Sequence, residues 1–396
     1  MAVLGVGQFL VNGSMTMIIP FLSLYLQSDL GVHGEHNVSL WTSVIFAANF
    51  ITSFLFQPFW GKLSDRYGRK PMLLRSGFGM AVVMVLMGFA ASPWQLLLLR
   101  MLNGTISGFN PASVSLVSSN TPKDRMGFAM GMLQSGGIAG TILGPFFGGL
   151  LADAVGFRPI FYLTGVTLFL ASLLSMIVVK EKFDKQAAAA TPQMTVTEGL
   201  RRLRRVPQIP ALLAVTFLIQ FAMMSPMSLI PLYVQRLHGT ADNLAFYAGF
   251  VNSVTGLSNM IASPLLGRLS DRIGGEKILG VALVGAAVAF IPQAFVHTVW
   301  QLLLCRFALG MFLGGLVPSV NALLRKYAPE GMATRAFSFN SSTLGLGNMV
   351  GPITGGVLSA WTGIEGLFLL SAALMFANAV WVYHSLLRGK RAPSKT

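Results

Sequence analysis

The feature that most constrains this chain is a series of apolar stretches, each about as long as a membrane is thick. A helix needs roughly 20 apolar residues to cross a hydrocarbon core of ~30 Å, and by that rule the sequence predicts about twelve such helices. Of the 396 residues, 54% are hydrophobic and only 10% are charged, against about 25% charged in soluble domains. The predicted fold class is therefore all-α integral membrane. The predicted helices lie near residues 1–26, 40–60, 71–91, 94–118, 127–152, 158–180, 208–234, 244–266, 278–297, 300–324, 334–360 and 364–387.

The Lys and Arg residues are distributed unevenly over these predicted helices and loops. Of the 28, 24 lie in alternate loops and the C-terminal tail, two lie in the other loops, and Arg100 and Arg306 fall inside predicted helices. Basic residues beside membrane helices concentrate on the cytoplasmic side. The distribution therefore predicts that both termini are cytoplasmic. It also assigns the net charge of +15 to contact with anionic lipid headgroups, and it argues against nucleic acid as a partner.

The two halves of the chain match each other at a nearly constant spacing. The Trp-Gln-Leu triplet at 94–96 recurs at 300–302, and the Asp-Arg pair at 65–66 recurs at 271–272, both 206 residues later. After one inserted residue, the Gly-Pro pair at 144–145 recurs at 351–352. Matches over most of both halves indicate a duplicated six-helix unit, which is the organisation of the two halves of major facilitator transporters.

The repeat also predicts the domain boundaries. We expect an N-terminal six-helix bundle over 1–180 and a C-terminal six-helix bundle over 208–387. Between them, 181–207 is predicted to be a cytoplasmic linker whose four arginines belong to a basic helix lying on the membrane surface. An alternative is that this linker is a regulatory or partner site. Residues 388–396 form a basic cytoplasmic tail.

A charged loop follows the second predicted helix and reads Gly-Lys-Leu-Ser-Asp-Arg-Tyr-Gly-Arg-Lys over 61–70. It resembles the major facilitator loop signature G-x-L-x-D-R-x-G-R-R/K at every fixed position. The resemblance implies a latch in which Asp65 reaches the positive N-terminus of the eleventh predicted helix, 334–360. A degraded second copy, with Asp271, would face the fifth predicted helix, 127–152. The alternative is a helix cap at a positively charged loop. The latch candidates are Gly61, Asp65, Arg66, Gly68, Arg69, Lys70, Asp271, Arg272, Arg125 and Arg335.

The fifth predicted helix, 127–152, carries small residues at four-residue spacing around a proline, and the eleventh, 334–360, repeats much of this pattern. It resembles the motif that marks proton-driven drug antiporters within the major facilitator superfamily. Small residues at this spacing let helices pack backbone to backbone, so ordinary helix packing is the alternative interpretation. The motif residues are Gly140, Gly144, Pro145, Gly148, Gly149, Gly351 and Pro352.

Arg100 lies in a predicted helix, six residues after Trp94, which places it roughly 9 Å below the outer end. Its surroundings resemble the family motif R-x-x-Q-G, with Asn103 in place of Gln. An arginine at this depth faces the bundle interior or water, so proton coupling or the sensing of substrate charge is expected. A structural hydrogen-bonding role or snorkelling to the interface is the alternative. The repeat partner of Arg100 is Arg306. Asp29, near the outer end of the first predicted helix, 1–26, is the nearest acidic coupling candidate.

All 13 acidic residues fall in loops or at helix ends. A cavity that holds arginine but no acid disfavours strongly cationic substrates, so neutral, zwitterionic or anionic amphiphiles are expected. Polar stripes at helical spacing mark the predicted cavity, although hydrogen bonds between helices would also explain them. The cavity candidates are Gln8, Asn12, Phe46, Asn49, Asn103, Gln134, Gln220, Met223, Asn252 and Asn340.

The resemblance to the drug:proton antiporter type of the major facilitator superfamily implies a function. We expect a monomeric secondary transporter in the cytoplasmic membrane of a bacterium, which exports drugs in exchange for protons and confers antibiotic resistance. The single Cys305 excludes an internal disulfide and a cysteine-rich metal site, and we expect no enzymatic activity, metal or cofactor. The alternatives are a lipid or glycolipid flippase and an importer of sugars or metabolites on the same fold.

Overall fold

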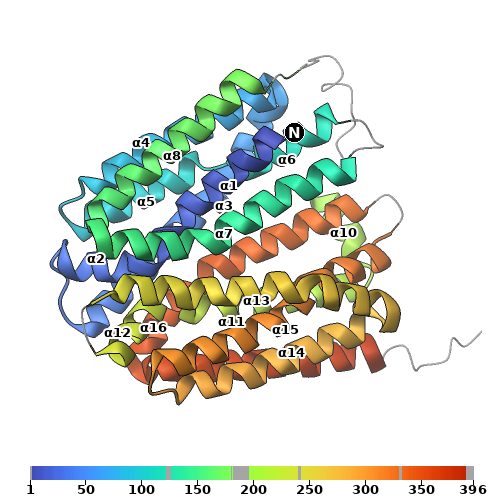
Figure 1. Ribbon diagram of the computed structural model, residues 1–396. Coiled ribbons are helices and arrows are strands. Elements are labelled where there is room, and N and C mark those ends of the chain that lie inside the picture. Colours follow the sequence, from blue (N-terminus) through green and yellow to red (C-terminus); the bar gives the residue numbers. More distant parts are fainter. Residues whose placement is uncertain are drawn as a thin grey trace, which may run out of the picture. The chain divides into compact units, whose positions relative to one another are not determined.

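The computed structural model describes residues 2–121, 126–179, 181, 196–239, 242–329 and 332–388. Across these ranges the chain is helical and contains no strand (Figure 1), so the all-α prediction is confirmed. Within the same ranges nine helical segments are long and apolar enough to cross a membrane. Twelve spans and cytoplasmic termini stay predictions.

The first repeat is built from eight α-helices and a short 3-10 turn. Helices α1, α3 and α4 pack against α7, α5 and α8, respectively. The start of α5 follows from its sequence, because the Ser92 side chain accepts a hydrogen bond from Gln95 N and Pro93 occupies the first turn. The elements are α1 (Ala2–Thr16), η1 (Ile19–Phe21), α2 (Leu22–Ser28), α3 (Glu35–Tyr67), α4 (Arg69–Gly88), α5 (Pro93–Ile106), α6 (Phe109–Asn120), α7 (Met126–Val155) and α8 (Phe157–Val178).

The second repeat follows a helix, α10 (Val196–Arg204), within the predicted linker. Its helix α16 is 50 residues long because it joins the two predicted helices 334–360 and 364–387 across a kink at Gly363, whose φ is +72°. Only glycine adopts such a φ readily. The elements are α11 (Gln208–Met227), α12 (Ile230–His238), α13 (Leu244–Ile273), α14 (Gly275–Phe290), η3 (Ile291–Ala294), α15 (Val299–Tyr327), α16 (Ala333–Val382) and the π-helical turn η4 (Tyr383–Arg388).

The helices form two compact units. Unit 1 comprises Met1–Pro192 with Ile230–Ser253, and unit 2 comprises Gln193–Leu229 with Val254–Thr396. The segment Ile230–Ser253, which belongs to the second repeat by sequence, therefore packs with first-repeat helices. The boundary between the units falls inside α13.

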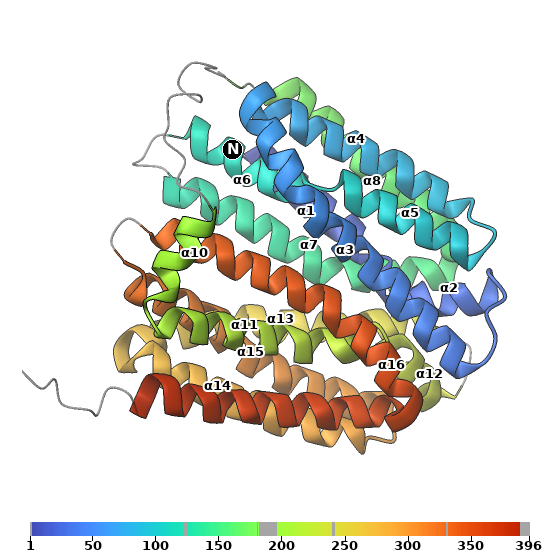
Figure 2. The ribbon, with the colours of Figure 1, turned by 180° about the vertical axis from the view of Figure 1, so that it is seen from behind.

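The fourth predicted helix, expected over 94–118, is two helices in the structure. Helix α5 ends at Ile106 and α6 begins at Phe109, and the two are separate segments in Figure 2. Between them, Ser107 is extended, with φ −56° and ψ 159°, and Gly108 has φ +149°. The prediction of one continuous helix is wrong here, because the backbone leaves the helical region at these two residues. The equivalent helix of the second repeat, α15, runs unbroken for 29 residues.

Candidate functional site

Unit 1 contains a cavity of about 310 Å³ between α1, α3, α5 and α6, beside the break in the fourth predicted helix. Interrupted helices line the substrate sites of many transporters, because the break exposes backbone groups and redirects side chains. Five of the predicted cavity and coupling residues line this cavity: Asn12, Phe46, Asn49, Arg100 and Asn103.

Arg100 is the charged residue of this cavity. Its side chain is only 6% exposed, yet its Nε has no hydrogen-bond partner within the described part of the chain. A buried guanidinium nitrogen without a partner is unfavourable. One turn further along α5, Asn103 donates from Nδ2 to Asn49 Oδ1 at 2.9 Å, while Asn103 Oδ1 has no partner among the described residues. The cavity therefore offers a cationic donor and an acceptor on the same face of α5.

An amide chain crosses from α1 to α6 beside the cavity. Gln8 donates from Nε2 to Asn110 Oδ1 at 2.5 Å, and Asn110 donates from Nδ2 to Asn12 Oδ1 at 3.0 Å. Gln8 and Asn12 were predicted from their helical spacing. Asn110 was missed, because it follows the helix break and belongs to no regular stripe.

The break itself is held by two residues that the sequence analysis also missed. Trp60 donates from its indole Nε1 to the carbonyl oxygen of Thr105 at 2.6 Å, at the end of α5. The guanidinium carbon of Arg75 lies 3.4 Å from the centroid of the Trp60 ring. A Cβ added at Gly108 would lie 3.5 Å from Arg75 Nη2. The signal in the sequence is that the second repeat has Leu266 and Val281 at the positions of Trp60 and Arg75.

In the second repeat the corresponding arginine is enclosed. Arg306 is 1% exposed, and its guanidinium carbon lies 5.6 Å from the centroid of the Phe368 ring. Two other predicted residues of this repeat are hydrogen-bonded, Gln220 of α11 to α16 and Asn252 within α13. Gln220 donates to Asn348 Oδ1 at 2.5 Å, and Asn252 donates to the carbonyl oxygen of Ala248 at 3.1 Å.

Four further predicted residues lie apart from the cavity. Asp29 forms an ion pair with Arg158 at 3.2 Å, directly after the end of α2. Gln134 is exposed on α7, and Met223 is half-buried on α11. Asn340 is buried on α16, and its Oδ1 has no hydrogen-bond partner among the described residues.

The glycine motif of the fifth predicted helix lies on α7, and it lets two neighbouring segments pack close to the α7 backbone. A Cβ at Gly140 or Gly148 would collide with carbonyl oxygens of Phe9 and Met17 in the α1–η1 region, and one at Gly144 would collide with Thr16 Oγ1. On another face, a Cβ at Gly149 would collide with the carbonyl oxygen of Ala245 on α13. The copy on α16 packs on α11, where a Cβ at Gly351 would lie 2.8 Å from Met224 Cβ.

An acidic residue fastens the same α7–α13 contact at the end that the charge distribution places outside. Asp153 accepts hydrogen bonds from the backbone nitrogens of Ala245 and Phe246, at 3.2 and 2.7 Å, and so caps the N-terminus of α13. Two turns further along, Ser253 donates to the carbonyl oxygen of Ile142 at 2.7 Å. The sequence analysis did not single out Asp153, because a carboxylate at a helix end carries no pattern of its own.

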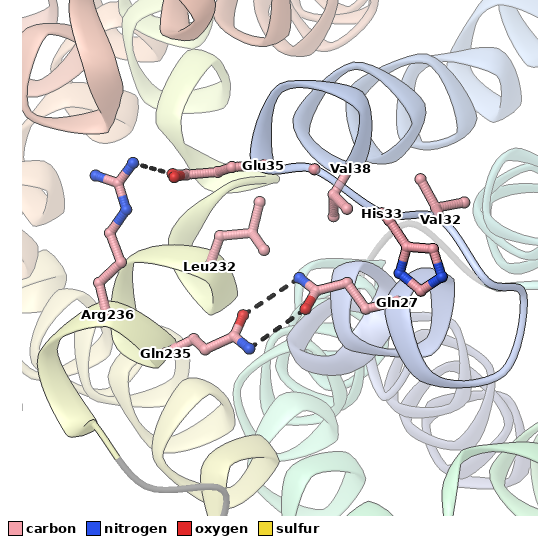
Figure 3. Close-up of a pocket in the computed structure, with 9 residues that line it drawn as sticks. Gln27, Val32, His33, Glu35, Val38, Leu232, Gln235 and Arg236 are labelled. Atoms are coloured by element: carbon pink, nitrogen blue, oxygen red, sulfur yellow. Dashed lines mark hydrogen bonds and ion pairs between the residues drawn. The ribbon is translucent and has the colours of Figure 1, made fainter.

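A pocket of about 300 Å³ lies at the same outer end, where α12 meets the loop between α2 and α3 (Figure 3). Gln27 and Gln235 exchange two amide hydrogen bonds across it, at 3.2 and 3.3 Å. Arg236 is paired with Glu35 beside them. Segment Ile230–Ser253 is therefore held to first-repeat helices by this pair of contacts and by Asp153.

The side chains of Asp65, Arg125 and Asp271 fall outside the described part of the structure, so the proposed latch is not tested. The neighbouring turn is described. Gly68 has φ +100° between α3 and α4, and the backbone nitrogens of Arg69 and Lys70 donate to Glu181, at 2.8 to 3.1 Å. The other latch candidates are described as follows: Gly61, Arg66 and Arg272 are exposed, and Arg335 is half-buried at the start of α16.

The chain matches the family model of the Major Facilitator Superfamily over residues 4–260 and 243–396. It is 41% identical to the multidrug resistance protein MdtG of Salmonella arizonae over 386 residues, which cover 98% of this chain and 95% of that one. It is 42% identical to the MdtG of Enterobacter lignolyticus, covering 97% and 91%.

Two solved structures share the fold at low sequence identity. The nucleoside transporter NupG superposes with a TM-score of 0.78 at 13% identity, covering 97% of both chains. A bacterial homolog of the human lysosomal transporter Spinster, in an inward-facing and occupied conformation, superposes with a TM-score of 0.76 at 15% identity, covering 99% of this chain and 98% of that one.

Proposed function

This chain belongs to the Major Facilitator Superfamily, and from that membership we propose that it exports small amphiphilic drugs by proton antiport and alternating access. It is a multi-pass secondary transporter of the bacterial inner membrane and not an enzyme. Multidrug resistance is the activity named for relatives that are about 40% identical over nearly the whole chain. The proton gradient is the driving force in this proposal, with no cofactor.

The cavity around Arg100 is the observation that carries the proposed substrate class. A buried guanidinium that faces the cavity repels cations, and the amides beside it hydrogen-bond neutral groups. Phe46, Phe50 and Met80 supply apolar and polarizable walls on the same cavity. Neutral, zwitterionic and anionic amphiphiles fit these walls and this charge.

Alternating access requires contacts that close one side at a time. On the outer side, we assign these contacts to Asp153 and the Gln27–Gln235 pair. On the cytoplasmic side, we assign the latch to Asp65 and the start of α16. The coupling candidates are Arg100, Arg306 and Asp29. We also propose twelve membrane spans, cytoplasmic termini and a monomeric state. The proposed domains are bundles over 1–180 and 208–387, a linker over 181–207 and a tail over 388–396.

Everted membrane vesicles test both direction and coupling. An exporter accumulates a neutral fluorescent drug inside such vesicles when respiration energises them, and a protonophore abolishes the accumulation. Asp65→Asn is expected to abolish accumulation while the protein stays in the membrane, and empty-vector vesicles give the background. Accumulation that persists after the proton gradient is dissipated would rule out antiport, and loss of drug from energised vesicles would indicate an importer.

A further inference from the structure

A groove on unit 2 lies apart from every site described above. It runs between α14 and the end of α16, with a volume of about 880 Å³. Apolar side chains form most of its length, and several of them are exposed, including Val281 at 64% and Phe376 at 57%. Its floor is open at Gly280, where an added Cβ would meet no heavy atom within 4 Å. The groove therefore has the volume and the apolar lining to hold a hydrocarbon chain.

One end of the groove is polar and basic. Lys277 in the first turn of α14 lies there with Tyr383 and His384 of η4, and all three are exposed. None of the eleven described residues that line the groove is acidic. The adjacent carboxylate, Glu276, is buried and pairs with Lys326 at 2.9 Å, so it is turned to a different partner. This end offers a cation and two hydrogen-bonding side chains to an anion.

The equivalent surface of the first repeat is filled. Leu74 and Phe78 stand on α4 where α14 has Gly280 and Val284. The Phe78 ring contacts the ring of Phe169 on α8, with centroids 5.3 Å apart. The polar end also differs in the first repeat, because Pro71 and Ile177 occupy the positions of Lys277 and His384, and the nearby Lys70 donates from Nζ to the carbonyl oxygen of Met176 at 2.8 Å. The duplicated helix packing therefore does not by itself account for the groove on the second repeat, where the cation of Lys277 is exposed.

We propose that this groove binds an anionic phospholipid of the cytoplasmic leaflet. The acyl chain lies along Val281, Val284 and Phe376, and the phosphate lies between Lys277 and His384. The charge distribution places the Lys277 end on the cytoplasmic side, where anionic lipids concentrate and where basic pockets between membrane helices bind their headgroups. The proposal depends on this orientation and is independent of the transported substrate.

The headgroup contact is tested with purified protein and phosphatidylglycerol. Native mass spectrometry counts the phosphatidylglycerol and phosphatidylcholine molecules that stay bound from an equimolar mixture. Wild type is expected to retain phosphatidylglycerol preferentially, and Lys277→Gln with His384→Gln is expected to lower that preference at least fivefold. Arg272→Gln is the matched control, because Arg272 is exposed on the same membrane side and does not line the groove. Wild type without a preference, or a control that loses as much as the double variant, overturns the proposal.

The acyl chain contact is tested by filling the groove. Gly280→Leu introduces the first-repeat residue into open space, so the fold is expected to persist, and bound phosphatidylglycerol is expected to fall at least fivefold. Gly131→Leu on α7 is the control, since a Cβ there also meets no heavy atom within 4 Å. A melting temperature within a few degrees of wild type establishes that both variants are folded. Full retention of phosphatidylglycerol by Gly280→Leu would show that the lipid is bound elsewhere, and it would overturn the proposal that this groove binds it.

Discussion

The two repeats of this chain share a helix-packing rule but differ in what they enclose. A Cβ at Gly104 would collide with the carbonyl oxygen of Asn49, and one at Gly310 would collide with that of Thr255, so the fourth helix packs closely on the second in both repeats. In the first repeat that helix then breaks after Ile106 and borders a cavity at Arg100. In the second repeat it continues unbroken, and Arg306 is packed over Phe368.

The duplicated pattern therefore determines the helix packing, and a few side chains without a match in the other repeat determine the site. Trp60 and Arg75 support the break, and they are replaced by Leu266 and Val281 in the second repeat. A lone glycine does not cause the break, because Gly314, the repeat partner of Gly108, lies inside the continuous α15. The break requires partners for the carbonyl groups that leave the helix, and Trp60 is one such partner.

The largest expected effect separates the two arginines. Arg100→Met removes the cation of the cavity, and we expect the initial rate of drug efflux to fall by about 100-fold, a loss of ~2.7 kcal/mol of transition-state stabilisation. Arg306→Met removes the same charge from an enclosed site, and we expect a smaller loss of about threefold to tenfold. Efflux rates in everted vesicles, normalised to the protein inserted, measure both. Equal losses would show that the repeats contribute alike.

The next effect concerns the contact of Asp153 with α13, whose acidic residue is also unmatched in the second repeat, since Ala360 occupies the equivalent position. Asp153→Asn removes a charge from the N-terminus of α13, worth ~0.3–2 kcal/mol, so the closed state should lose up to about 30-fold in population. Labelling of a cysteine at Met15, which lines the cavity, measures opening to the outside in a Cys305→Ser background.

Asp242→Asn is the matched control for that experiment. It removes a carboxylate that is exposed beside the same helix start and makes no capping bond in the described structure. Labelling should therefore stay at the wild-type rate. An equal increase in both variants would assign the effect to net charge and remove the capping contact from the explanation.

The smallest effect tests what holds the break. Trp60→Phe keeps an aromatic ring under Arg75 but removes the hydrogen bond to Thr105, which contributes ~0.5–1.5 kcal/mol. We expect KM for drug to rise about threefold to tenfold with a smaller change in kcat, because the cavity wall shifts while the arginine remains. Trp94→Phe, at a tryptophan that is 65% exposed, should leave both constants unchanged. A fall in kcat alone would contradict a role in shaping the cavity.

Much of the architecture could be predicted from the sequence. Hydropathy and the uneven charge distribution predict a helical membrane protein, and the 206-residue repeat predicts its duplication. The loop over 61–70 and the glycines of α7 indicate the family. These properties are readable because each rests on a periodic or local pattern: apolar length, charge on alternate loops, or small residues one turn apart.

The site needed the tertiary structure. Asn12, Asn49 and Asn103 were predicted by their spacing, but the cavity they line depends on a helix break that hydropathy does not reveal. Trp60 and Thr105 are 45 residues apart, and Asp153 and Phe246 are 93 apart, so their contacts exist only once the helices pack. The sequence by itself determined the membrane environment, the repeat and the family. Only the packed structure shows that the first repeat opens into a cavity at Arg100, because Trp60 satisfies a backbone group that the helix break frees there.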